Sequence, residues 1–348
     1  MSDAEAGSTL TRRATITDVA RASGTSIKTV SRVFNDEPFV RAETKAKVLE
    51  AARRLDYHPN VAARSLVRGR SSLIGLFYEN PSPNYVVDLQ TGALDRLHEE
   101  RFQLLLFPCE RTADVSGRLL KVARASGLEG LILAPPIGDD ARTLRELADA
   151  RIPFVRIAPT TASDASPSVS IDDVAAAREM TQRLIDLGHR AIAFVQGDPT
   201  HPSNTQRLLG YREALAAASI DADPALLEQG TYTFDSGVEA GRRLFSRGRL
   251  PTAVFAANDD MAAGLLVAAN ERGLSVPGQL SVAGFDDSLI SRVVWPQLTT
   301  IRQPTYDMAR TATQTLVAMI DGQPYEPHVR LSFDLLVRSS IAPPIATR

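Results

Sequence analysis

The chain of 348 residues contains a single cysteine, Cys109, so it cannot form an internal disulfide bond. That usage agrees with a reducing compartment. No apolar run approaches the ~18 residues that a membrane-spanning helix needs. The N-terminal sequence MSDAEAGSTLTRR lacks the basic start and the apolar stretch of a secretory signal peptide. We therefore expect a cytoplasmic protein without a membrane partner.

The sequence also lacks the motifs of common catalytic sites. It has no GxGxxG dinucleotide fingerprint, no Walker GK[ST] loop and no GxSxG nucleophile elbow. No metal-ligand spacing is found among the histidines, which are His58, His98, His189, His201 and His328. These absences predict a protein that is not an enzyme, with no catalytic residue, no cofactor and no metal site.

Charge is unevenly distributed, although the net charge is only −2. Residues 1–70 carry 13 Lys and Arg against 8 Asp and Glu, a balance of +5. The remaining residues carry 26 against 33, a balance of −7. A basic N-terminal part on an acidic body suggests that a polyanion contacts the first part only.

Three short helices are predicted in the basic part. The first begins at Thr15-Ile16-Thr17-Asp18, a sequence similar to a capping box, and Gly24 permits a sharp turn after it. Ser26 is a good N-cap for the second helix, and a third helix is expected at about residues 42–55. Two short helices joined by a glycine turn and supported by a third indicate a helix-turn-helix.

The second helix, within TSIKTVSRVFN at residues 25–35, has an apolar side and a basic side. Val30 and Val33 can be buried, while Lys28 and Arg32 crowd the opposite side. In the major groove of DNA, Lys and Arg bind guanine acceptors, and an aliphatic side chain contacts thymine methyl groups. A helix whose charged face is merely solvated would show the same pattern, so this window alone leaves both interpretations open.

From Leu73 onward, apolar runs typical of buried strands alternate with amphipathic segments. The runs are LIGLFY (73–78), QLLLF (103–107), GLILA (130–134), PFVRI (153–157), AIAFV (191–195), AVFAA (253–257) and SVAGF (281–285). This alternation predicts parallel sheets that are covered by helices on both faces. About 270 residues are too many for one sheet, so we expect two similar, doubly wound α/β lobes.

Polar residues cluster after several of these runs, at Glu79-Asn80, Asp172-Asp173, Asn258-Asp259-Asp260 and Asp286-Asp287. Doubly wound sheets bind ligands beyond the carboxyl ends of their strands. These residues are therefore candidates for a ligand pocket. Asp and Asn in such places also cap the helix that follows, and the pattern alone does not decide between the two roles.

Several motifs occur in an order that resembles the LacI/GalR family of bacterial transcription regulators over almost the whole chain. They are ITDVARASGTSIKTVSRVFN, YHPNVAARSL, SSLIGL, LGHRAIAFVQG, QRLLGYREAL, FAANDDMAAGLL, SVAGFDDS and LTTIRQP. The resemblance implies a small all-α helix-turn-helix domain followed by a periplasmic-binding-protein-like domain of two α/β lobes. The implied base-edge residues are Ser26, Ile27, Lys28 and Arg32, and the implied phosphate contacts are Thr29 and Asn35.

The resemblance also makes residues 60–67 a hinge helix. In this family, two such helices pair in the minor groove and wedge leucines between bases. Leu66 is the candidate wedge, and Asn60 and Ala63 join it among the expected DNA-binding residues. A passive linker is the alternative, because two helical turns are too short to be stable alone. The alternation of small residues with Leu66 favours the hinge.

For the effector, the resemblance implies a pocket in the cleft between the lobes. The residues that match family motifs or positions are Arg207, Asn258, Asp286, Ser203, Tyr232 and Asp173. From the first lobe, Tyr78, Asn80 and Tyr85 are candidates, although ENPSPNY departs from the commoner loop. Arg207 is the leading contact, because a buried guanidinium offers five donors to a sugar or a carboxylate. Its alternative role is a salt bridge to Asp286 across the empty cleft.

Together these features predict a sequence-specific DNA-binding transcriptional regulator, a repressor, associated with the nucleoid. A small polar effector, a sugar or sugar derivative, would control its affinity for double-stranded operator DNA. We expect a homodimer on a near-palindromic site, since a short hinge helix needs a partner. A transporter's solute-binding protein and an enzyme acting on sugars or nucleotides are the alternatives. The basic N-terminal module disfavours the first, and the missing catalytic groups disfavour the second.

The expected domain limits follow from these assignments. Residues 1–13 form a disordered tail, 14–58 the helix-turn-helix domain, 59–71 the hinge and linker, and 72–348 the effector-binding and dimerisation domain. Within the last, the first lobe comprises about 72–170 and 301–332, and the second about 171–300 and 333–348.

Overall fold

The structure is a computed structural model that describes residues 14–34, 37–57, 71–98, 100–109, 115–161, 166–248 and 250–345. The chain divides into two compact units, residues 1–71 and residues 72–348. The predicted N-terminal tail and nearly all of the predicted hinge lie outside the described residues. So do four of the candidate DNA contacts, namely Asn35, Asn60, Ala63 and Leu66.

The N-terminal unit contains the three predicted helices. They are α1 (Ile16–Ser23), α2 (Ile27–Phe34) and α3 (Ala42–Arg54). Thr15 and Asp18 form the expected capping box at the start of α1, and Gly24 ends that helix in the left-handed conformation at φ 65°. Arg41 precedes α3 without a side-chain cap. The three helices enclose a small core in which Val19, Val30, Val33, Val48, Ala51 and Ala52 are buried.

The C-terminal unit contains two six-stranded sheets. In spatial order, the first sheet is β11 (His328–Arg330), β5 (Ser168–Ser170), β4 (Phe154–Ile157), β3 (Gly130–Leu133), β1 (Leu73–Tyr78) and β2 (Gln103–Pro108). All of its paired strands are parallel. Strands β3 and β4 are buried along their whole length, as parallel strands between two helix layers must be.

The second sheet has the same plan with one antiparallel edge. Its order is β12 (Asp334–Leu336), β10 (Thr299–Arg302), β9 (Ser281–Asp286), β8 (Ala253–Ala256), β6 (Ile192–Gln196) and β7 (Leu227–Gln229). Only β12 runs antiparallel to its neighbour. Because β10 pairs with β9 as far as Arg302, the second sheet extends slightly beyond the approximate lobe limit at residue 300.

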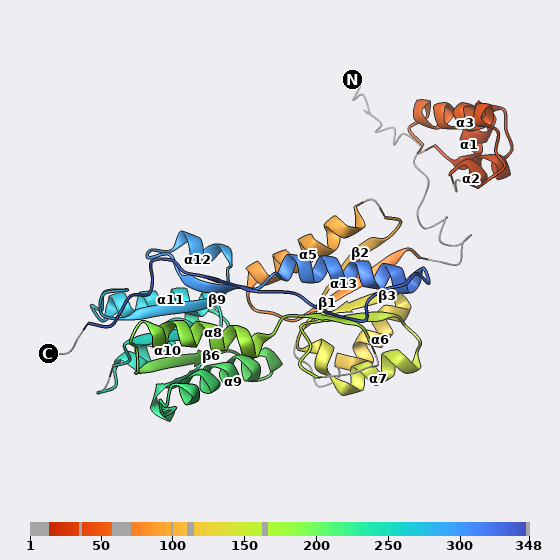
Figure 1. Ribbon diagram of the computed structural model, residues 1–348. Coiled ribbons are helices and arrows are strands. Elements are labelled where there is room, and N and C mark those ends of the chain that lie inside the picture. The colour runs from red at the N-terminus through yellow and green to blue at the C-terminus, as the bar shows by residue number, and fades with distance from the viewer. Residues whose placement is uncertain are drawn as a thin grey trace, which may run out of the picture. The chain divides into compact units, whose positions relative to one another are not determined.

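Helices cover both faces of each sheet. In the first lobe, α5 (Pro83–Leu97) packs with α13 (Thr305–Ile320), and α6 (Val115–Ala125) packs with α7 (Ala141–Asp149) on the other side (Figure 1). In the second lobe, α8 (Asp173–Asp186) packs with α9 (Pro202–Ala217), and α10 (Phe234–Phe245) with α11 (Asp259–Glu271). The short elements are η1 (Ile137–Asp139), η2 (Pro224–Leu226) and α12 (Leu289–Val293). The predicted two-lobed, doubly wound architecture is thus confirmed.

The chain passes between the two lobes three times, after β5, after β10 and after β11. These three connections link the lobes covalently. Loops follow the carboxyl ends of the parallel strands. Among the described residues, no helix is both long and apolar enough to cross a membrane.

Candidate functional site

Helix α2 presents a polar, exposed face at its beginning. Ser26 caps the helix, since its Oγ accepts a hydrogen bond from the Thr29 backbone N–H at 3.1 Å and lies 2.9 Å from the Thr29 hydroxyl. Ile27 is 49% exposed, and Lys28 is exposed beside it. An exposed isoleucine next to a lysine contributes nothing to the small core. This surface is therefore available to a partner.

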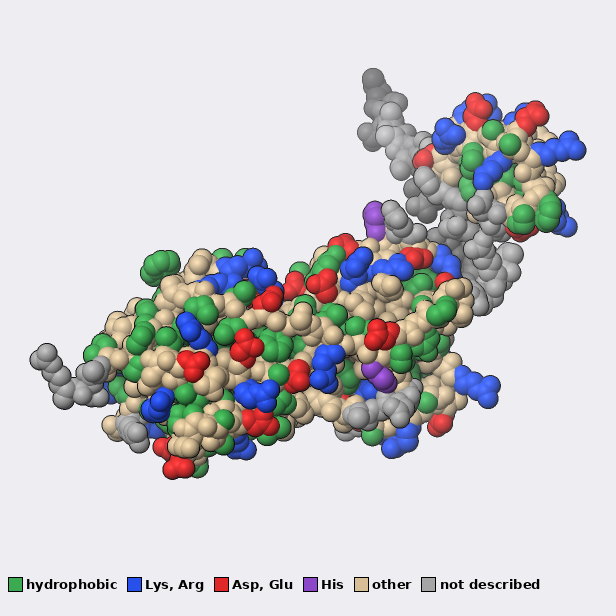
Figure 2. Space-filling model, viewed as in Figure 1, with side chains coloured by type: hydrophobic (Ala, Val, Ile, Leu, Met, Phe, Trp, Pro, Cys, Tyr) green, Lys and Arg blue, Asp and Glu red, His purple; other side chains and the backbone are tan. Residues whose placement is uncertain are grey.

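Arg32, one turn further along α2, is exposed but already has a partner. Its guanidinium Nε lies 3.3 Å from a Glu37 carboxylate oxygen, and both side chains are about half exposed. Such a surface ion pair contributes roughly 0–1 kcal/mol. Arg32 can therefore leave Glu37 for a stronger acceptor at little cost. Lys and Arg side chains stand out on several sides of this unit in Figure 2.

In the C-terminal unit, the candidate pocket lies where the predicted strand ends converge. Residues from both lobes line one small cavity: Asn80, Ser82, Tyr85, Pro135, Ala158, Asp173, His201, Ser203, Arg207, Tyr232, Asn258, Asp286 and Gln303. Nearly all of them follow the carboxyl end of a parallel strand or begin the next helix. This is the location that doubly wound sheets use for ligands.

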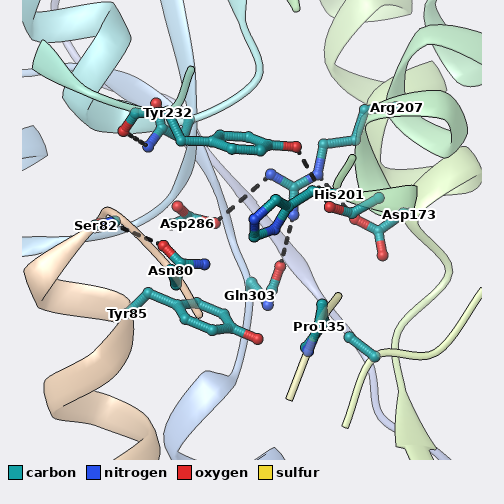
Figure 3. A pocket seen from close by; sticks show the side chains of 13 residues that line it. Asn80, Ser82, Tyr85, Pro135, Asp173, His201, Arg207, Tyr232, Asp286 and Gln303 are labelled. Carbon is teal, nitrogen blue, oxygen red and sulfur yellow. Dashed lines mark hydrogen bonds and ion pairs between the residues drawn. The ribbon is translucent and has the colours of Figure 1, made fainter. Parts of the chain in front are cut away.

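Arg207 on α9 is the centre of this cavity (Figure 3). Its Nε donates to a carboxylate oxygen of Asp173 at 2.8 Å, and its Nη2 donates to Oε1 of Gln303 at 2.9 Å. Its Nη1 donates to the carbonyl oxygen of Ala257. The guanidinium carbon lies 3.5 Å above the centre of the Phe285 ring. One buried side chain thus holds four strand-end segments of the pocket in place.

The predicted salt bridge from Arg207 to Asp286 is only partly right. Asp286 lies 3.8 Å from Nη1, whereas Asp173 accepts a hydrogen bond at 2.8 Å. Both carboxylates belong to the second lobe, so neither contact crosses the cleft. Burial lowers the pKa of Arg207, but Asp173 and Asp286 outweigh burial and raise it, which keeps the guanidinium charged.

Asp286 has an unusual backbone conformation and a carboxyl group with an unusual pKa. Its φ is 112°, a region that side-chain-bearing residues rarely adopt. Burial raises the pKa of Asp286 well above its usual range, with Asp259 and Asp260 acting in the same direction and Arg207 opposing them. A strained, buried carboxyl group that faces a cavity is typical of a functional position.

Tyr232 forms the opposite wall of the cavity. Its ring lies against Gly197, where a Cβ atom would come within 2.0 Å of the ring, so glycine is required there. The Tyr232 hydroxyl is 3.3 Å from the Ser203 hydroxyl, and the ring meets that of His201 edge-on, with centroids 5.5 Å apart. Burial raises the pKa of Tyr232 to about 12, so the phenol stays protonated.

Asn258 lines the cavity, but both ends of its amide already have structural partners. Oδ1 accepts from the Met261 backbone N–H at 3.0 Å and caps α11, and Nδ2 donates to the Tyr232 carbonyl at 2.9 Å. Asp259 is equally structural, since it accepts hydrogen bonds from Ser288 and Thr300. Burial raises the pKa of Asp259 to about 7. The sequence left ligand binding and helix capping open at Asn258-Asp259-Asp260, and the structure shows that Asn258 caps α11.

The first lobe supplies Asn80 and Ser82 from the turn that leads into α5, and Tyr85 from the first turn of that helix. Asn80 accepts a hydrogen bond from the Ser82 backbone N–H at 2.8 Å. The Ser82 hydroxyl donates to a carboxylate oxygen of Asp260 at 2.6 Å, a buried bond that joins the lobes. Tyr85 is buried beside them, and burial raises the pKa of its phenol. Asn80 and His201 both point into the cavity in Figure 3.

Eight of the nine effector candidates meet in this cavity, and Tyr78 does not. Tyr78 lines a neighbouring cavity instead, and its hydroxyl accepts a hydrogen bond from Gln90 at 3.2 Å. Prediction from sequence missed Ser82, His201 and Gln303. Gln303 lies in LTTIRQP, which contributed to the resemblance, but no role was assigned to it. Ser82 and His201 lie in turns without periodicity, and they gave no signal of their own.

The comparisons with known proteins agree with both units. Residues 15–60 match the family model described as bacterial regulatory proteins, lacI family, and residues 181–341 match that of a periplasmic binding protein-like domain. Catabolite control protein A of Priestia megaterium is 34% identical over 310 residues, which cover 89% of this chain and 93% of that protein. This chain belongs to the lacI family of bacterial regulatory proteins.

Other relatives of this lacI-family chain include the HTH-type transcriptional regulator CelR of Thermobifida fusca. It is 35% identical over 338 residues, covering 94% of this chain and 98% of that protein. A solved CelR–cellobiose complex has a TM-score of 0.72 at 32% identity and covers 94% of this chain and 100% of that chain. The Lac repressor dimer bound to operator and the anti-inducer ONPF has a TM-score of 0.85 at 28% identity, with coverage of 95% and 100%. The lacI-family protein is thus a DNA-binding transcriptional regulator.

Proposed function

We propose that this lacI-family regulator is a repressor whose affinity for operator DNA is controlled by a sugar or sugar derivative bound between its lobes. The observation that carries the proposal is the cavity around Arg207. It joins a guanidinium, two carboxylates and two phenols at the strand ends of a protein that also has a helix-turn-helix. Hydroxyl-rich ligands suit such a mixture of donors and acceptors. The CelR–cellobiose complex, a similar regulator with a bound sugar, supports a sugar as the effector.

On the DNA side, we propose that Ser26, Ile27, Lys28 and Arg32 face base edges. Thr29 and Asn35 would contact phosphate, and Asn60, Ala63 and Leu66 would act in the minor groove. The exposure of Ile27 and Lys28 supports this assignment for α2. The partner would be a near-palindromic operator, as the Lac repressor dimer bound to operator suggests. A regulator of this kind works in the cytoplasm on the nucleoid, without enzymatic turnover.

The proposed domains are those expected from the sequence: 1–13, 14–58, 59–71 and 72–348. Residues 1–71 and residues 72–348 form separate compact units, which supports an effector domain that folds as a unit.

The test of this function is a thermal-shift screen of sugars and nucleosides followed by a mobility-shift assay on the DNA upstream of the protein's own operon. A ligand that binds only the folded state raises the melting temperature. The hit should then change the affinity for the operator. A nucleoside hit with no sugar hit would contradict the proposed effector class, and the absence of any retarded DNA would contradict the proposed regulator.

We predict that Asp286→Ala retains operator binding and loses its response to the effector. Asp286 lies in the pocket of the C-terminal unit, so it can influence DNA only through the arrangement of the lobes. A ligand shifts that arrangement only by binding one state better than the other, and removing a polar contact reduces that difference. Effector and operator affinities should both be measured. Wild-type effector affinity with wild-type switching in Asp286→Ala would show that the pocket is misplaced.

We also predict a homodimer. Several large apolar side chains on and after α12 are exposed, including Leu289, Val293 and Trp295, the last by 85%. Exposed apolar groups that cluster on one segment often mark a protein contact. Sedimentation at micromolar concentration should therefore give a dimer, and Trp295→Asp should shift it toward monomer. A stable wild-type monomer with full operator affinity would refute this prediction.

A further inference from the structure

A second cavity opens beside the one around Arg207. It measures about 520 Å³ and shares Asn80 and His201 with the inner cavity. Its other walls come from the loops after β1, β2, β6 and β7. Strands β2 and β7 are the edge strands farthest from β11 and β12 in their sheets. We call this space the outer cavity.

The two cavities differ greatly in size. The inner cavity measures about 30 Å³, which holds one or two water molecules. The outer cavity falls within the ~300–1,000 Å³ of ordinary small-molecule sites. A sugar ring reaches Arg207 only if the inner walls move apart, whereas the outer cavity already has room for a ring.

The outer cavity has the chemistry of a site for polyols. Pro81 and Pro108 offer apolar surfaces on which the face of a sugar ring can pack. Thr231, Glu79 and Asp198 place hydroxyl and carboxylate groups in its lining, and one Asp198 oxygen already accepts hydrogen bonds from Thr200. This alternation of flat apolar walls and a few polar groups is typical of ligand sites.

The charged side chains of the inner cavity favour neutral sugars over anionic ones. In the inner cavity, the single guanidinium of Arg207 faces the two carboxyl groups of Asp173 and Asp286. The Arg207 guanidinium is already paired with the Asp173 carboxylate at 2.8 Å. A phosphate or carboxylate on the ligand would therefore meet no surplus positive charge among the described residues of the inner cavity, which disfavours binding.

We propose that the outer cavity is a second saccharide subsite, so that the effector is a neutral saccharide of at least two sugar units. One unit lies against Arg207 and the next lies against Pro81, Pro108 and Thr231. This inference rests on the proposed function, because it assumes that the inner cavity receives a sugar. It extends that function by specifying the length and the charge of the effector.

The test compares saccharides of increasing length on the full-length protein. Glucose, galactose and mannose, their disaccharides and trisaccharides in several linkages, and the 6-phosphates of the same sugars are titrated by calorimetry. We expect the best disaccharide or trisaccharide to bind about tenfold or more tightly than its constituent monosaccharides, because the second ring adds contacts. The 6-phosphates should bind more weakly than the neutral sugars.

Thr231→Trp provides the matched variant. Thr231 is exposed and lines the outer cavity but not the inner one, so a larger side chain there fills the space without entering the core. This variant should lose the advantage of the longer saccharide and keep the affinity for the monosaccharide, while Thr231→Ala should retain most of that advantage, because it removes a single hydroxyl contact and leaves the space open. A disaccharide advantage that survives Thr231→Trp would overturn the subsite.

Cys109 gives an independent readout on the unmodified protein. It is the only cysteine of the chain and lines the outer cavity, where it is half-buried. Burial raises the pKa of its thiol to about 11, so alkylation should be followed at alkaline pH. A bound disaccharide should slow alkylation, and a saturating monosaccharide should not. Equal rates with both would overturn the subsite.

The outcomes separate the two proposals. If monosaccharides bind as tightly as longer saccharides, the outer subsite is wrong and the sugar effector stands. If no saccharide binds while a nucleoside or another ligand does, the proposed effector class is wrong, and the saccharide subsite is wrong with it.

Discussion

Replacing Arg207 with alanine should lower the free energy of unfolding of the C-terminal unit by about 3–5 kcal/mol, because it breaks a buried ion pair by removing one partner. The Asp173 carboxylate would lose its 2.8 Å hydrogen bond while remaining largely buried. Gln303 and the Ala257 carbonyl would each lose a donor as well. The same variant should lose its response to the effector, since the pocket loses its central donor.

The control for this prediction is Arg178→Ala. Arg178 forms an exposed pair with Glu213 at 3.2 Å, so its loss should cost less than about 1 kcal/mol. Arg207→Lys adds a second comparison, because a lysine carries its donors on one nitrogen and cannot bond Asp173, Gln303 and the Ala257 carbonyl from the separate positions that the planar guanidinium reaches. Urea denaturation followed by circular dichroism measures all three variants. If Arg207→Ala costs no more than Arg178→Ala, Asp173 finds solvent or another donor, and Arg207 does not organise the pocket.

The main strands of the fold could be predicted because a strand that is buried on both faces is composed almost entirely of apolar residues. The run at residues 73–78 and the run at residues 281–285 each correspond to a strand within one residue at either end. Both are interior strands with a paired neighbour on each side, and helices on the two faces require apolar side chains throughout. The helix-turn-helix followed from capping residues and one glycine, and these act locally.

Five short strands could not be predicted from their composition. Strands β5, β7, β11 and β12 have three residues each, and β10 (Thr299–Arg302) has four. All five lie at or next to a sheet edge: β7, β11 and β12 are edge strands, and β5 and β10 are next to one. A segment as polar as Leu227–Gln229 becomes a strand because β6 offers it hydrogen bonds, not because its side chains demand burial.

The sequence predicted which residues line the cavity more successfully than it predicted the contacts between them. The motif assigned Arg207 correctly to the cavity, but not its partners, since those depend on how three loops meet. Asp286 has a φ of 112°, and its carboxylate stays 3.8 Å from the guanidinium. Asp173, at the first turn of α8, comes closer. Such distances are set by tertiary packing, about which a single sequence gives no information.

The final prediction concerns how α2 reads DNA. Lys28→Ala should weaken binding to the operator by roughly 1–3 kcal/mol per half-site if the ammonium group contacts a base edge. Lys28 is exposed at the start of α2 next to Ile27, so its removal leaves the small core intact and folding should not change. A base contact also predicts relaxed preference at one position of each half-site, whereas a phosphate contact would weaken all sequences alike and flatten the salt dependence.

The measurement is the dissociation constant on operator and on random DNA at several salt concentrations. Lys47→Ala is the matched control, because it removes the same charge from an exposed position on α3 that pairs with Glu43 at 2.8 Å. Both variants lower the general attraction to the polyanion by one positive charge. Only Lys28→Ala should lower the ratio of operator to random affinity. Equal losses on the two DNAs for Lys28→Ala would show that Lys28 contacts the DNA backbone, which would leave Ser26, Ile27 and Arg32 as the candidate base contacts.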